Sequence, residues 1–149
     1  MDPMLSELHK RHGDALSKYA YFLLALTAAA MAFSLQRSEK EVFGLLLLPL
    51  ALAMVSWAFS FMSGIKNLTY TNACVAANHT YLQLKFGCHP NQPAPHLVGS
   101  AMEGTLEGLD KNMSSAARYG KAQLWLFVFG ALLYVVWHVA KIWANSNAT

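Results

Sequence analysis

Three long apolar runs constrain this chain more than any other feature of its sequence. They cover residues 19–36, 42–65 and 123–144 of a chain of 149 residues. A helix needs about 20 mostly apolar residues to cross the ~30 Å hydrocarbon core of a bilayer, and about 17 is the lower limit. Backbone N–H and C=O groups in lipid must bond within their own segment, so each run is expected to be helical. We therefore predict an all-α membrane protein with three transmembrane helices.

The composition favours the bilayer over water as the solvent of these runs. The chain is 55% hydrophobic and only 13% charged, whereas a soluble domain is about 25% charged. A small soluble protein buries only part of its surface and could not hide three such runs. The net charge is +3, and the lysines and arginines are scattered without a basic block. We therefore expect no nucleic-acid partner.

The first run admits a second interpretation, as a cleaved signal peptide, because small residues follow its apolar stretch. The segment before it argues against this. Residues 1–18 include the acids Asp2, Glu7 and Asp14, and a normal signal peptide begins with a shorter, basic region. We interpret residues 1–18 as an amphipathic leader, a short helix with Asp2 as its cap and Pro3 at its first position.

The segment between the second and third runs, residues 66–122, has the pattern of a helical hairpin. Its apolar residues step by four and three along both halves, as on one face of a helix. They are Tyr70, Cys74, Ala77, Tyr81 and Leu84, then Met102, Leu106, Leu109 and Met113. Gly and Pro are absent from Ile65 to Phe86, whereas residues 87–95 begin with Gly87 and contain three prolines. A helix should therefore end near Phe86.

A second helix should resume near His96 and continue into the third span. Two amphipathic helices joined by a short turn fold as an antiparallel hairpin. We therefore expect the second and third transmembrane helices to extend into a cytoplasmic antiparallel helical hairpin. Gly104 and Gly108, four residues apart, are expected to let a neighbouring backbone approach closely.

The basic residues lie unevenly around the three runs. The leader and residues 66–122 carry eight Lys and Arg residues, whereas the first loop and the end of the third run carry three. Basic residues favour the cytoplasmic side of a membrane. We expect a multi-pass protein of the inner (plasma) membrane, with a cytoplasmic N-terminus and the tail, residues 145–149, outside. Cys74 and Cys88 would then be free thiols in a reducing compartment.

Small residues recur at helical spacing within the first two spans, and such faces let membrane helices pack tightly. The candidate packing residues are Ala25, Ala29 and Ala32 in the first span, and Ser56, Ser60 and Gly64 in the second. The spacing does not say whether the helix that meets each face belongs to this chain or to a neighbour.

Candidate chemistry is sparse. The third span holds His138, with Tyr134 one turn earlier, and either side chain could contact a ligand or line a pore. His9 and His12 have a spacing that can share a metal, but a site would need at least two more ligands. We therefore expect no metal or other cofactor.

These features favour a non-catalytic membrane protein that acts through helix–helix contacts, as an accessory subunit or scaffold of a membrane complex. Its expected partners are the lipid bilayer and either further copies of itself or other membrane subunits. One alternative is a homo-oligomeric pore, channel or membrane-disrupting effector, with Ser56, Ser60, Tyr134 and His138 as lining residues. An enzyme would need Cys88, His89 and His96 to assemble a site at the membrane surface.

Overall fold

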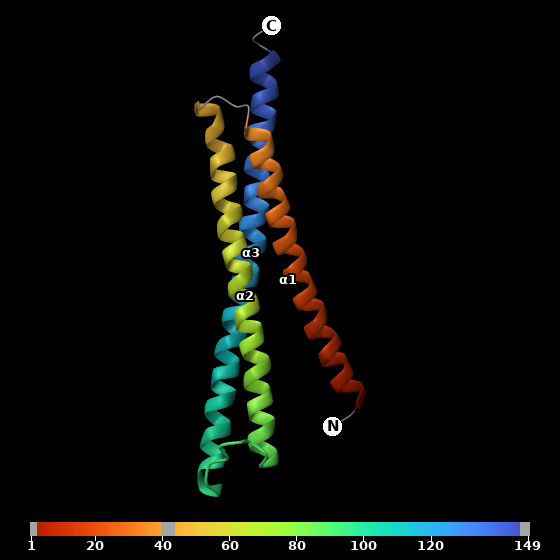
Figure 1. The fold of residues 1–149 in the computed structure, drawn as a ribbon, viewed down its shortest axis with the longest axis vertical. Coiled ribbons are helices and arrows are strands. Elements are labelled where there is room, and N and C mark those ends of the chain that lie inside the picture. Colours follow the sequence, from red (N-terminus) through yellow and green to blue (C-terminus); the bar gives the residue numbers. More distant parts are fainter. Residues whose placement is uncertain (1–2, 40–43, 147–149) are drawn as a thin grey trace. The chain divides into compact units, whose positions relative to one another are not determined.

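Three helices account for most of the described chain. The computed structural model describes residues 3–39 and 44–146, with side chains from residue 18 onwards. Its helices are α1 (Pro3–Ser38), α2 (Leu48–Phe86) and α3 (Val98–Ser146). Short 3-10 turns precede α2 at Leu45–Leu47 and α3 at Pro95–Leu97. Figure 1 shows α2 in yellow to green and α3 in teal to blue.

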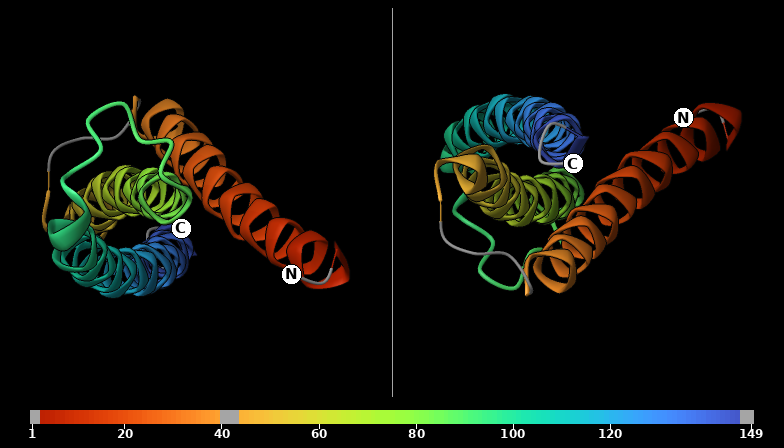
Figure 2. Two further views of the ribbon diagram at one scale, coloured as in Figure 1. Left: turned by 90° about the horizontal axis from the view of Figure 1, so that it is seen from below. Right: turned by 90° about the horizontal axis from the view of Figure 1, so that it is seen from above.

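The all-helical fold and the antiparallel hairpin are confirmed. Helices α2 and α3 run in opposite directions and lie side by side along their length, and both end-on views in Figure 2 agree on this. Within the described residues, three helices are long and apolar enough to cross a membrane. The first of these candidate spans is Lys18–Ser38.

Helix α1 joins the leader to the first apolar run. It continues for 36 residues from Pro3 to Ser38, so the leader is the start of a long helix and not a short separate one. Asp2, the expected cap, and the side chains of His9 and His12 lie outside the described residues.

Helix α2 begins and ends where its sequence allows. Pro49 lies in its first turn, where a missing backbone N–H removes no intrahelical bond. At the other end, Gly87 adopts a positive φ of 70°, which glycine reaches without a Cβ penalty. The N–H of Gly87 donates to the carbonyl of Leu84 (3.3 Å), and the N–H of Cys88 donates to that of Gln83 (3.0 Å). This pattern is a Schellman cap, and it ends α2 at Phe86 as expected.

The chain divides into two compact units. We call residues 1–65 with 120–149 the span unit, and residues 66–119 the hairpin unit. In the span unit, the second half of α1 contacts both other helices: Leu24 lies against Gly64 of α2, and Phe33 against Tyr134 of α3. In the hairpin unit, the last part of α2 packs on the first part of α3.

Candidate functional site

Polar side chains on α2 bind the backbone of α3 directly in the span unit. The hydroxyl of Ser56 donates to the carbonyl of Leu126 at 2.7 Å. That of Ser60 donates to the carbonyl of Gln123 at 2.7 Å, and the indole N–H of Trp57 donates to that of Phe127 at 3.1 Å. All three α2 side chains are buried. The hydroxyls of Ser56 and Ser60, which the pore alternative needs on an open surface, are therefore turned into the helix pair.

The same kind of contact recurs in the hairpin unit. The side-chain amide of Asn67 donates to the carbonyl of Ala116 at 2.7 Å. The thiol of Cys74 lies 3.9 Å from the carbonyl of Leu109. Positions 60, 67 and 74 on α2 advance by sevens, while their acceptors at 123, 116 and 109 on α3 retreat by sevens. We call this series the donor ladder.

Two glycines allow the close approach that these hydrogen bonds require. A Cβ on Gly130 would lie 2.5 Å from the indole nitrogen of Trp57. A Cβ on Gly64 would lie 2.6 Å from Nε2 of Gln123 and 2.7 Å from Cδ2 of Leu24. The expectation for Gly104 and Gly108 is not met, because a Cβ at either would find nothing within 4 Å. Close approach therefore occurs in the span unit.

The buried face of α1 differs from the one its alanines suggest. Ala25, Ala29 and Ala32 are all exposed. Among the side chains of α1 from Lys18 onwards, Ala20, Leu23, Thr27 and Ser34 are buried. Thr27 is accommodated because its hydroxyl donates to the carbonyl of Leu23 at 2.6 Å, within the helix. Hydropathy and residue size could not separate these two faces, since both are mostly small and apolar. The alanine face remains a prediction for contact with a neighbouring molecule.

The seam residues predicted on α2 are buried or half-buried, whereas two of those predicted on α3 are exposed. Tyr70, Cys74, Ala77 and Tyr81 are half-buried, Leu84 is buried, and Met102 and Leu109 on α3 are half-buried. Tyr70 stacks on Tyr119 with ring centres 5.6 Å apart. In contrast, Leu106 and Met113 are exposed.

Thr105 and Asn112 occupy the half-buried positions one residue before Leu106 and Met113. Thr105 needs no partner on α2, because its hydroxyl donates to the carbonyl of Ala101 at 2.8 Å within α3. The seam on α3 is therefore more polar than the apolar spacing predicted.

Exposed apolar side chains gather on one side of the hairpin unit. Val75 and Leu82 follow the interface residues Cys74 and Tyr81 on α2 by one position, and Leu106 and Met113 follow Thr105 and Asn112 on α3. Seen from one end, successive residues turn in opposite senses on antiparallel helices. A residue that follows an interface position therefore points to the same side on both helices.

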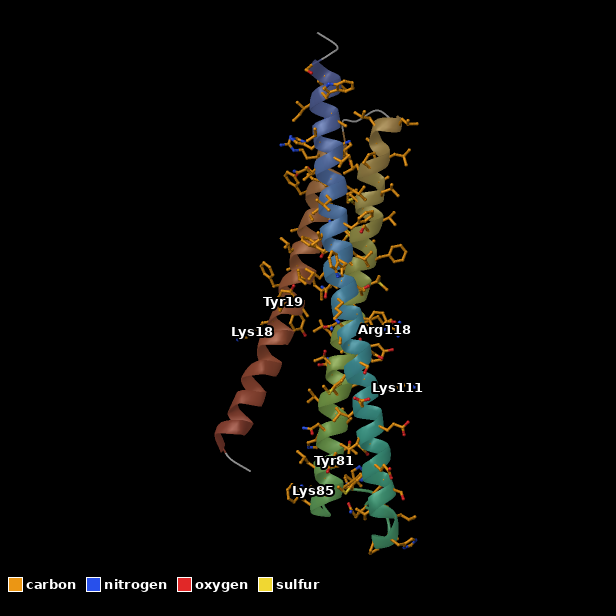
Figure 3. All side chains as sticks on the ribbon, turned by 180° about the vertical axis from the view of Figure 1, so that it is seen from behind. Lys18, Tyr19, Tyr81, Lys85, Lys111 and Arg118 are labelled. Carbon is orange, nitrogen blue, oxygen red and sulfur yellow. The ribbon has the colours of Figure 1, made fainter. Side chains whose placement is uncertain are left out.

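We call these four residues the apolar side of the hairpin. Their exposed fractions are 67% for Val75, 39% for Leu82, 44% for Leu106 and 59% for Met113. The same rule places charged residues on this side as well, because Glu103 and Asp110 follow the interface residues Met102 and Leu109 of α3, and Lys85 follows Leu84 near the end of α2. Figure 3 labels Lys85 on α2, and Lys111 and Arg118 on α3.

Tyr134 lies at the centre of an aromatic cluster in the span unit. Its ring centre is 6.4 Å from that of Phe33 on α1, 5.9 Å from that of Trp57 on α2 and 5.5 Å from that of Trp137. The exposed His138 stacks on Tyr134 with ring centres 6.5 Å apart. The structure therefore brings Tyr134 and His138 together, but within a packed cluster.

The remaining chemistry-bearing residues stay apart. Cys74 and Cys88 are both free thiols, and burial raises the pKa of the Cys74 thiol above its ordinary value. The ring nitrogen Nδ1 of His89 accepts the N–H of Asn91 at 3.2 Å. Among the described residues, no group of three His, Cys, Asp or Glu side chains could hold a metal ion.

Comparison with protein-family models, curated proteins and solved structures found no significant match to this chain.

Proposed function

We propose that this protein is a non-catalytic adaptor of a membrane complex, in which the three spans anchor a helical hairpin that docks a partner helix. The observation that carries this proposal is the apolar side of the hairpin, where the large side chains of Val75, Leu82, Leu106 and Met113 are exposed. Large apolar side chains that gather on one exposed side mark an interaction site.

The character of this side points to a helical partner. Protein interfaces combine large apolar side chains with polar and charged ones. The four apolar residues lie on two neighbouring helices, so a partner helix could rest its own apolar stripe along the groove between them. The acids Glu103 and Asp110 on the same side favour a partner that carries basic residues.

The hydrogen bonds made by polar side chains between α2 and α3 agree with a structural role. Side-chain donors of α2 are bound to backbone carbonyls of α3, so they hold two helices together and leave no activated nucleophile or base. An enzyme would need Cys88, His89 and His96 to converge on a substrate, yet Cys88 and His96 are exposed on the turn between α2 and α3.

Site-specific photocrosslinking in native membranes tests this proposal. A benzoylphenylalanine placed at Met113, on the apolar side, should give one adduct of defined mass. The matched control is the same group at Glu107, an exposed position of α3 off the apolar side. An adduct at twice the mass of the chain would identify a second copy as the partner. Equal crosslinking at both positions, or none at Met113, would overturn the proposal.

A further inference from the structure

The side-chain amide of Gln123 is buried in the span unit without a hydrogen-bond partner. The residue is 1% exposed, and its Nε2 finds no acceptor among the described residues. The backbone carbonyl of the same residue accepts the hydroxyl of Ser60 at 2.7 Å, so the backbone is satisfied while the side chain is not. Polar side chains in membrane helices usually pair with a group on a neighbouring helix. The unpaired amide therefore marks a place for an acceptor.

Helix α1 covers this amide with an apolar side chain. A Cβ on Gly64 would lie 2.6 Å from Nε2 of Gln123 and 2.7 Å from Cδ2 of Leu24, so the amide, the glycine and the leucine meet at one point. Gly64 has no side chain, and Leu24 has no polar side-chain atom to accept a hydrogen bond. Helix α1 therefore buries the amide of Gln123 without satisfying it.

Helix α1 is held to the other two helices by apolar and aromatic packing. The hydroxyls of Thr27 and Ser38 donate to carbonyls of α1 itself, and the buried hydroxyl of Ser34 has no partner among the described residues. In contrast, α2 donates three side-chain hydrogen bonds to the backbone of α3 within the span unit. Lipid chains are as apolar as leucine, so apolar contact alone gives little preference for a protein helix over lipid. Of the three spans, α1 is therefore the one most easily exchanged.

We propose that α1 is an exchangeable helix, and that the face of α2 and α3 beneath it binds a transmembrane helix of a partner protein. The partner helix carries a side-chain acceptor, such as the amide oxygen of asparagine or glutamine, at the level of Gln123. That oxygen would take the place of the Leu24 side chain and accept the N–H of Nε2, which neither α1 nor lipid can do. The α1 helix of a second copy would present the same leucine, so the partner is a different protein.

A synthetic transmembrane helix tests this face. The probe is a polyleucine segment flanked by lysines, with one asparagine one turn inside each end, because Gln123 begins the third apolar run. The control probe contains leucine alone. Energy transfer from the labelled full-length protein to the dilute labelled probe, in phosphatidylcholine vesicles, measures binding. We expect the asparagine probe to bind at least about threefold more tightly than the leucine probe, and Gln123→Met to remove that preference. Equal binding of both probes to the wild-type protein would overturn the proposal.

The matched control replaces a glutamine that is not buried. Gln36 is exposed on α1, and Gln36→Leu should leave the preference for the asparagine probe unchanged. A loss as large as that caused by Gln123→Met would show that the asparagine probe does not read the buried amide, and would overturn the site.

Fixing α1 in place tests the exchange separately. The rings of Phe33 and Tyr134 have centres 6.4 Å apart, so Phe33→Cys with Tyr134→Cys, in a Cys74→Ser, Cys88→Ser background, places two thiols that a short bismaleimide can join. The linked protein should lose its preference for the asparagine probe, whereas the same protein capped with N-ethylmaleimide should keep it. A preference that survived the link would show that the probe binds without displacing α1, and would overturn the exchange.

Discussion

Of the two glycines at close helix contacts in the span unit, Gly130 has the less room for an added side chain. A Cβ there would meet the Trp57 indole at 2.5 and 2.6 Å, and this ring is rigid and fixed by its hydrogen bond to the carbonyl of Phe127. At Gly64 the nearest atoms are the ends of the flexible Gln123 and Leu24 side chains. The two glycines therefore differ in how far their surroundings can yield.

Replacing Gly130 by alanine should destabilise the protein by about 1–3 kcal/mol, the usual cost of overpacking a well-filled interior. The matched control is Gly108→Ala on the same helix, where a Cβ meets nothing within 4 Å. Alanine there should be neutral or raise stability by up to about 1 kcal/mol through helix propensity. Thermal unfolding in one detergent measures both variants. A Gly130→Ala protein as stable as the wild type would contradict the packing described here.

The two thiols should differ in reactivity. Cys74 is half-buried, and burial raises the pKa of its thiol because the charged thiolate is desolvated. Alkylation requires the thiolate, so Cys74 should react more slowly than the exposed Cys88 at neutral pH. The midpoint of its rate against pH should also lie higher. Mass spectrometry after timed iodoacetamide treatment measures both rates, and faster labelling of Cys74 would contradict this assignment.

At the scale of elements, the donor ladder holds α2 to α3. Ser60 of this ladder, and Ser56 one turn before it, are buried and donate to α3 carbonyls in the span unit. Hydrogen bonds between membrane helices contribute about 0.6 kcal/mol each on average. Each bond therefore adds little to the stability of the helix pair. The regular spacing of these bonds mainly fixes the register of α2 against α3.

Ser56→Ala with Ser60→Ala should lower stability by about 1 kcal/mol, which follows from about 0.6 kcal/mol for each bond. Ser114→Ala, at an exposed position of α3, serves as the control and should change stability by less than about 0.5 kcal/mol. Titration with a denaturing detergent gives both values. If the double variant matched the control, these hydroxyls would contribute nothing to holding the pair.

The helices could be predicted from the sequence, whereas the residues through which they contact one another could not. Gly87 and the prolines after it marked the end of α2, because backbone chemistry at such residues is local. The seam of α3 was not accessible, because apolar spacing selected Leu106 and Met113 while the interface uses Thr105 and Asn112. Thr105 is accommodated there because its hydroxyl donates to the carbonyl of Ala101 within its own helix, and spacing within one helix carries no record of the packing against the other. The buried Gln123 and the close contact at Gly130 were missed for the same reason.

At the scale of the whole molecule, the buried polar groups in the span unit bear on what holds α1. The hydroxyl of Ser34 and Nε2 of Gln123 are buried, and neither has a hydrogen-bond partner among the described residues. Ser34 is on α1, and the Gln123 amide lies beside Gly64, against which Leu24 of α1 also packs. Unpaired buried polar groups cost about 1–3 kcal/mol each. Helix α1 should therefore be held less firmly than α2 is held to α3.

The orientation in the membrane decides whether the apolar side of the hairpin can meet a cytoplasmic partner. Both native cysteines lie in the hairpin or its turn, and Cys88 is exposed. A membrane-impermeant maleimide should therefore leave the wild-type protein unlabelled in intact cells and label it once the membrane is permeabilised. The reporter for the other side is Asn145→Cys, at an exposed position near the end of α3, in a Cys74→Ser, Cys88→Ser background.

Asn145→Cys should be labelled in intact cells, because three crossings place the end of α3 opposite the hairpin. The basic residues around the spans, eight against three, predict this arrangement through their preference for the cytoplasmic side. If Cys88 were labelled in intact cells while position 145 were protected, the orientation of the protein in the membrane would be the reverse of the one predicted. The hairpin would then face outward, and the partner helix would have to be sought on the outer side of the membrane.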